Sequence, residues 1–145
     1  MESPLSSIPD SRFTISELGF ADSHTHIVMF KPEDRPGVLD RAHRQNVQLM
    51  VVPGTTVADS AEAVEFVQSK PNLFATVGVH PHEAKDYVNN SAALQEFHAL
   101  AKKPKVVAVG EIGLDYYYNH SDREDQIKLL RFQLTVAQEH KLPVI

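Results

Sequence analysis

The segment Val106-Val107-Ala108-Val109-Gly110-Glu111 decides the fold, because four apolar residues in a row lead directly into a glycine and a carboxylate. A short run that is apolar at every position is typical of a parallel strand covered on both faces. A carboxylate after such a run is costly unless it is paired, bound to a metal or placed at the open end of the strand. The segment therefore predicts a buried strand that delivers Glu111 to one edge of a sheet.

Outward from this segment, apolar runs and helical periodicities alternate along the chain. We expect strands at residues 20–22, 48–52, 73–79 and 106–109, and the start of a fifth at residues 142–145. Helices are expected at residues 37–46, 57–67 and 94–101 and after a capping box formed by Ser121 and Glu124. The apolar side of the last helix is predicted to hold Ile127, Leu130, Leu134 and Ala137.

This alternation indicates an α/β protein with a parallel sheet covered by helices. A doubly wound sheet and the first half of a (β/α)8 TIM-type barrel both fit, but the first strand–helix turn lacks the G-x-G-x-x-G pattern of dinucleotide sites. Candidate functional residues follow strands one, three and four, which favours the barrel. We expect a flexible lead-in at residues 1–16 and a partial barrel at residues 17–145, truncated in strand five.

Composition narrows the class of protein. The 145 residues are 42% hydrophobic and carry a net charge of −5, so the surface as a whole is not the basic footprint of a nucleic-acid-binding module. A nucleic-acid enzyme stays open, because metal ions supply local positive charge. The chain has no cysteine and no apparent secretory signal or membrane span, so we expect a cytoplasmic protein, or a nuclear one in a eukaryote.

His24 and His26 flank Thr25 directly after the first predicted strand. In an extended segment, residues two apart point to the same side, so both imidazoles can reach one divalent ion. An exposed or hydrogen-bonded histidine pair is the alternative. Glu111 converges on the same edge and could bridge two ions, or form a salt bridge at the strand end.

Further polar groups follow the third and fourth strands. His80 and His82 are candidate ligands or donors to a substrate phosphate, or they form a simple capping turn. Asp115 could orient a metal-bound water or a histidine, or bond nearby backbone N–H groups. Tyr116 begins a run of three tyrosines that could stack on bases or cover the rim.

The other histidines have simpler interpretations. We expect His98 to be a half-buried packing residue, and His43 and His140 to lie near helix C-termini, where partial positive charge is favoured. His120 lies in a loop beside the predicted site, and its role is left open.

Taken together, the motifs resemble the TatD family of metal-dependent deoxyribonucleases, among the amidohydrolase-like barrels. The matching segments lie at residues 22–26, 78–82 and 109–117, and in the helix with Gln126 and Gln133 that runs into residues 142–145. They occur in the expected order from Phe20 to Ile145, and their combination is specific.

The resemblance implies a function. His24 and His26 would bind one metal ion, and Glu111 would bridge it to a second, with Mg²⁺ the usual ion and Zn²⁺ or Mn²⁺ the alternatives. From the residues themselves, we expect Glu111 and Asp115 to be catalytic and His80, His82 and Tyr116 to bind substrate. The substrate would be DNA, attacked from its 3′ end by an exonuclease.

Other functions remain open from sequence. The same ligands would serve an amidohydrolase or esterase acting on a small molecule, or a deacylase of D-aminoacyl-tRNA. The resemblance also implies histidines after strands five and six and an aspartate after strand eight, none of which this chain contains. The chain by itself is thus expected to be a catalytically incomplete, truncated product that could self-associate.

The predicted strand at residues 142–145 ends without the ligand that its position requires in the family. We therefore predict that the parent reading frame continues past Ile145, with histidine as the next residue. Sequencing the locus and its transcripts checks this, and a natural stop codon directly after Ile145 in an intact gene would contradict it.

Overall fold

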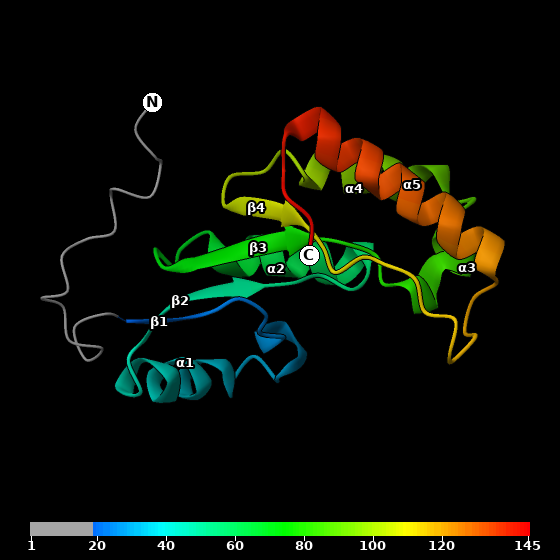
Figure 1. Cartoon of the computed structure of the whole chain (residues 1–145). Helices are drawn as coiled ribbons and strands as arrows, with labels where there is room; N and C mark the ends of the chain where they lie inside the picture. Colours follow the sequence, from blue (N-terminus) through cyan, green and yellow to red (C-terminus); the bar gives the residue numbers. More distant parts are fainter. Residues whose placement is uncertain (1–18) are drawn as a thin grey trace, which may run out of the picture.

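The computed structural model describes residues 19–145, and the predicted lead-in at residues 1–16 lies outside the described residues. The four strands form one parallel sheet in the order β1-β2-β3-β4 (Figure 1). Their bounds are β1 (Phe20–Asp22), β2 (Val47–Val52), β3 (Leu73–Val77) and β4 (Val106–Val109). The first four strands predicted from sequence are thus confirmed, the third with a shorter end, while the predicted start of a fifth at residues 142–145 forms an isolated bridge at Val144.

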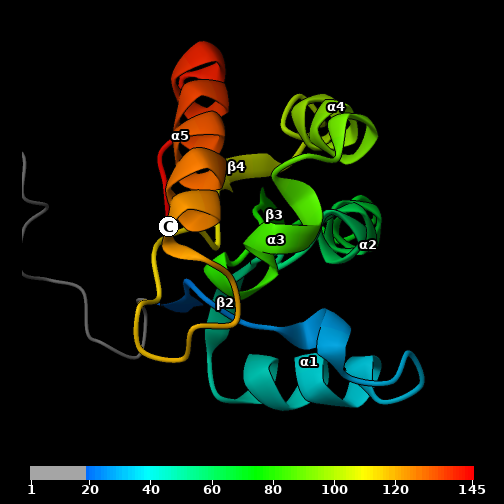
Figure 2. The same ribbon diagram turned by 90° about the vertical axis from the view of Figure 1, so that its right-hand side faces the viewer.

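Longer helices alternate with the strands: α1 (Arg35–Arg44), α2 (Val57–Val67), α4 (Ser91–Leu100) and α5 (Arg123–His140). Short helical elements fill the loops after two strands: η1 (Ile27–Met29), η2 (Pro81–Glu83) and α3 (Ala84–Tyr87). Viewed from the side in Figure 2, the longer helices form an arc around the strands. Across residues 19–145, we find no helix with both the length and the apolar character needed to cross a bilayer.

The strand order distinguishes the two architectures considered above. A doubly wound sheet reverses its strand order at a switch point, whereas each new strand here is added beside the preceding one. The progression continues after α5, because Val144 forms a parallel bridge with Val109. The chain is therefore an α/β structure with the arrangement of the N-terminal half of a (β/α)8 barrel.

The core lies between the strands and their helices. Val52, Val77 and Val109 are fully buried, as is Phe97 of α4, whose ring contacts Phe132 of α5 at a centroid separation of 5.7 Å. Full burial of such side chains contributes roughly 1.5–3 kcal/mol each. This packing fixes the direction of the strands and hence the place where their C-terminal ends meet.

The predicted apolar side of α5 is wrong in part. Ile127 and Leu134 are 37% and 43% exposed, while the buried stripe is Gln126, Leu129, Gln133, Val136 and Ala137. The inner stripe contains two glutamines because each bonds backbone groups that are buried beneath the helix. Hydrogen bonds to fixed backbone atoms thus determine the rotation of α5, rather than apolar area alone.

Two glycines let the ends of β3 and β4 approach closely. A Cβ atom on Gly78 would lie 2.2 Å from the carbonyl carbon of Gly110 and 2.4 Å from the nitrogen of Glu111. The hydroxyl of Thr76 donates to the Gly110 carbonyl oxygen at 2.5 Å. Only a residue without a side chain fits at position 78, because the opposing atoms belong to backbone.

We predict that Gly78→Ala lowers the free energy of unfolding by about 2–3 kcal/mol, because the added methyl group must displace backbone. Gly37→Ala is the matched control. The nearest atom to its added Cβ is a side-chain nitrogen of Arg41 at 3.4 Å, and alanine is the better helix former. The control should leave stability unchanged or raise it by roughly 0.5 kcal/mol. Urea unfolding measures the stability of both variants. Equal effects of the two substitutions would contradict the claim that backbone atoms leave no room for a side chain at position 78.

Candidate metal centre

The candidate site is built from loops that follow the C-terminal ends of three strands. Hydrogen bonds between backbone groups fix these loops against one another: Thr25 donates to Val51 O at 2.9 Å, and Glu111 donates to Gly54 O at 2.8 Å. The N–H of His80 donates to Thr55 O at 2.8 Å. The last residues of β2 and the turn after it therefore supply carbonyl groups that orient the loops after β1, β3 and β4.

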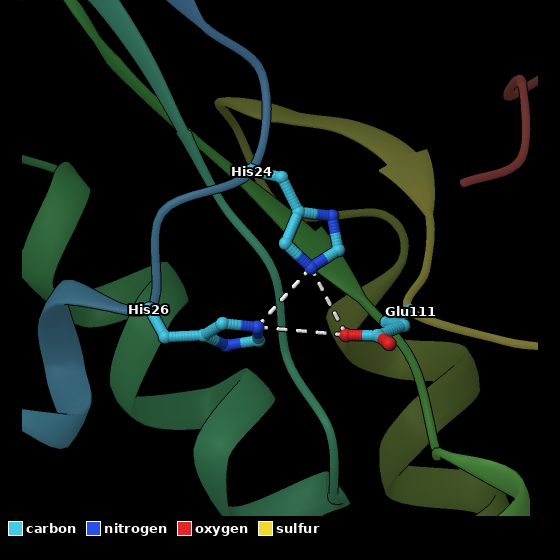
Figure 3. A group of neighbouring side chains, drawn as sticks. All are labelled: His24, His26 and Glu111. Atoms are coloured by element: carbon cyan, nitrogen blue, oxygen red, sulfur yellow. Dashed lines mark hydrogen bonds and ion pairs between the residues drawn. The ribbon is translucent and has the colours of Figure 1, made fainter.

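His24, His26 and Glu111 bring their side-chain tips together (Figure 3). The Nε2 atom of His24 lies 3.1 Å from Nε2 of His26 and 3.0 Å from Oε2 of Glu111. The Nε2 atom of His26 lies 3.5 Å from the same oxygen. The two imidazoles thus point to one side, as the period-two spacing predicts, although residues 23–26 lie beyond the end of β1.

This geometry suits a cation. Tetrahedral coordination at about 2.0–2.1 Å places ligand atoms roughly 3.3 Å apart, close to the separations found here. Hydrogen bonds among these three side chains would leave at least one acceptor atom poorly paired, because two imidazole nitrogens and a carboxylate oxygen all converge on one point. Two nitrogen donors and one oxygen donor are a set that first-row divalent ions accept.

His80 faces the other oxygen of Glu111, with its Nε2 atom 3.6 Å from Oε1. Burial, and then the neighbouring His82, lower the pKa of His80, so the imidazole is neutral at pH 7. Its Nδ1 atom accepts from the His82 backbone N–H at 3.3 Å, which assigns the ring proton to Nε2. His80 therefore presents an N–H donor at the site.

His82 and Asp115 form a close pair, with Nε2 2.5 Å from Oδ2. The other oxygen of Asp115 accepts from the backbone N–H groups of Tyr117 and Tyr118 at 2.9 and 3.1 Å. The bond to His82 first, and then these two bonds, lower the pKa of Asp115 to about 2. Asp115 is thus ionised; one of its oxygens contacts the His82 ring and the other accepts from backbone N–H groups, so its geometry fits both sequence interpretations.

Two open clefts flank Glu111. The first cleft, of ≈ 450 Å³, is lined by His80 and by the loop from Glu111 to Tyr117, which includes Tyr116. The other, of ≈ 430 Å³, is lined by His26, His80 and His82 among others. Tyr116 is 38% exposed, and the Arg123 guanidinium lies over its ring, 4.5 Å from the ring centroid. All seven sequence-predicted site residues therefore lie at one edge of the sheet.

Sequence reasoning named Gln126 and Gln133 only as part of the family pattern and missed that they hold these loops. Gln126 accepts from Asp115 N–H at 2.8 Å and donates to Asp115 O at 2.9 Å. Gln133 makes the same paired contacts with the backbone of Val79, at 2.7 and 3.1 Å. Polar residues seven apart on the inward side of a helix were the available signal.

Ser121 and Arg35 are two further positioning residues. The Ser121 hydroxyl donates to His82 O at 2.7 Å and accepts from Lys85 N–H, so the predicted capping box is wrong; α5 begins after Asp122, whose side chain makes no capping bond. Arg35 is 8% exposed and donates to Val28 O and Phe30 O in the loop after His26.

Comparison with curated proteins finds bacterial nucleases. The chain is 38% identical over 113 residues to the 3′-5′ ssDNA/RNA exonuclease TatD of Erwinia tasmaniensis. It is 39% identical over 112 residues to the protein of the same name from Edwardsiella piscicida. Each alignment covers 77% of this chain but only 43% and 42% of the relative, so the chain spans less than half the length of these relatives.

Comparison with solved structures gives the same relationship. A TatD homologue from Escherichia coli K12 superposes with a TM-score of 0.75 at 32% identity, covering 86% of this chain and 49% of that one. A hydrolase of the TatD family from Entamoeba histolytica superposes with a TM-score of 0.73 at 28% identity, covering 87% and 48%. The architecture is thus half of the relatives' fold. The family model described as TatD related DNase matches residues 21–145, and the chain belongs to this family.

Proposed function

We propose that the chain is the N-terminal half of a metal-dependent deoxyribonuclease that hydrolyses phosphodiester bonds from 3′ ends. The observation that carries the proposal is the convergence of His24, His26 and Glu111 within hydrogen-bond distance at the C-terminal edge of the strands. The exonuclease names of the bacterial relatives support nucleic acid as the substrate. Such a substrate fits a cytoplasmic location, or a nuclear one in a eukaryote.

Different atoms of the proposed ligands would bind the two metal ions. His24 and His26 hold one divalent ion through their Nε2 atoms, together with Oε2 of Glu111. The second carboxylate oxygen, Oε1, faces His80 and is free to bridge to a second ion. Mg²⁺ is the ion that the family resemblance favours, while the imidazole donors also suit Mn²⁺ and Zn²⁺. When bound, divalent ions in such sites activate water and neutralise charge on phosphate oxygens.

Other side chains prepare the site for a phosphate. The neutral His80 offers its Nε2–H to a phosphate oxygen. Because the ring carries no positive charge, it does not repel the cations proposed beside it. Asp115 acts on His82 by fixing the ring, so it is a positioning residue as well as a candidate catalytic one. Tyr116 lies at the cleft rim, where its exposed face could stack on a base.

We predict that Glu111→Gln in the full-length parent lowers cleavage of 3′-ended single-stranded DNA roughly 100-fold or more. The amide keeps the size of the side chain but removes the charge that would hold two cations, and lost metal stabilisation is worth several kcal/mol. Glu124→Gln, an exposed substitution in the first turn of α5, is the matched control and should leave the rate unchanged. Initial rates at matched Mn²⁺ or Mg²⁺ measure the effect. Parent-like turnover by the Glu111→Gln protein, with normal circular dichroism, would refute the bridging role.

We also predict that the 145-residue chain alone is catalytically inert and self-associates. Apolar side chains are exposed along the sheet and its margins, including Phe20, Leu49 and Val144 at 54%, 37% and 50%. Such surface beside unpaired strand edges favours pairing with another copy. Light scattering after size exclusion, together with nuclease assays in Mg²⁺ and Mn²⁺, tests both parts. A monomer that degrades DNA at the parental rate would overturn them.

A further inference from the structure

A second group of potential metal ligands lies far from the first, where the C-terminal ends of α4 and α5 meet. His98 is in the last turn of α4, and Glu139 and His140 are the last two residues of α5. Because helices of β/α units run antiparallel to their strands, these helix ends lie at the opposite edge of the sheet from Glu111. The group is thus separate from the nuclease site proposed above.

The geometry places three ligand atoms together. One from each residue lies within 4.8 Å of the other two. The Nε2 atom of His98 is 2.8 Å from Oε2 of Glu139, and the two imidazole centroids are 4.8 Å apart with their planes 66° from parallel. The two rings therefore meet edge to face, beside the Glu139 carboxylate.

His140 supplies an independent observation. Its Nε2 atom is buried and has no hydrogen-bond partner, one of two such side-chain atoms among the described residues. Leaving a buried polar atom unpaired costs about 1–3 kcal/mol, so such an atom requires an explanation. His98 and Glu139 remain accessible, with side chains 33% and 53% exposed, so an ion could enter from solvent.

We propose that His98, Glu139 and His140 form a binding site for a first-row divalent transition-metal ion such as Zn²⁺. Two imidazoles and one carboxylate are a three-ligand set that Zn²⁺ accepts with water in the remaining position. Mg²⁺ prefers oxygen ligands in octahedral geometry, and two of the three donors here are nitrogen. The bound ion would join two helices that are 41 residues apart at this point of the chain.

The site should therefore work as a clip between α4 and α5. These helices already touch through the rings of Phe97 and Phe132. Because the ion would bind only the folded state, the stability of the folded chain would rise with the logarithm of the Zn²⁺ concentration above the dissociation constant. This role requires no catalysis and does not depend on the proposed nuclease function.

The test uses the 145-residue chain with His24→Ala and His26→Ala, which removes the first site from the measurement. Isothermal titration with Zn²⁺ should give one site, and excess Mg²⁺ should not displace the ion. Adding His98→Ala or His140→Ala should raise the dissociation constant by about tenfold or more. His43→Ala, an exposed histidine at the end of α1, is the matched control and should leave it unchanged.

Two further measurements keep the result interpretable. Glu139→Gln alters an exposed side chain, so it should fold normally and still weaken Zn²⁺ binding. Titration with Co²⁺ should produce visible d–d absorption that disappears in the His98→Ala protein. Absence of one-to-one Zn²⁺ binding in the double-alanine background, or binding that is equally tight without His98, would overturn the proposal.

Discussion

The peptide unit between Gly110 and Glu111 lies directly against Gly78, where an added Cβ atom would fall 2.2 Å from backbone. This contact brings the end of β4 against the end of β3, and the Thr76 hydroxyl secures it by bonding Gly110 O. The position of Glu111 follows from it, since the residue leaves the sheet at a point fixed by backbone on both sides. A carboxylate so placed needs no flexible reach to meet the histidines that follow β1, so the site is largely preorganised.

The loops around this contact are held by polar side chains that come from helices. Gln126 and Gln133 reach from α5 to the backbone of the Asp115 and Val79 loops, and Ser60 of α2 bonds both the N–H and the O of Gly78. Each of these bonds pairs a backbone group beyond the end of a strand, where no neighbouring strand is available to form a hydrogen bond with it. The helices therefore have two roles: their apolar residues cover the sheet, and their few buried polar residues determine the loop conformations at the site.

The sequence predicted the order of the elements and the edge where the candidate ligands meet, because both depend on local periodicity and on the parallel arrangement of strands. The H-x-H spacing was sufficient to place His24 and His26 on one side. The rotation of α5 was not predictable in this way, since Ile127 and Leu134 satisfy an apolar periodicity as well as the true inner stripe does. What decides between the two stripes is the set of backbone groups beneath Gln133, and these become known only when distant segments are brought together.

The two proposed metal sites differ in how much of each lies within the chain. The site at the C-terminal strand edge draws on loops after β1, β3 and β4, and the chain spans only about half the length of its relatives, so the proposed full-length parent would add groups to the same edge. The helix-end group depends only on the last turns of α4 and α5, both of which are present here. One donor set includes a carboxylate with a second free oxygen facing a cleft, which suits an ion that must also meet substrate. The other donor set would join two helices that already pack against each other, which suits an ion that holds structure. The two donor sets are thus alike in residue type and differ in setting, since one lies among loops at the strand ends and the other at the ends of two helices.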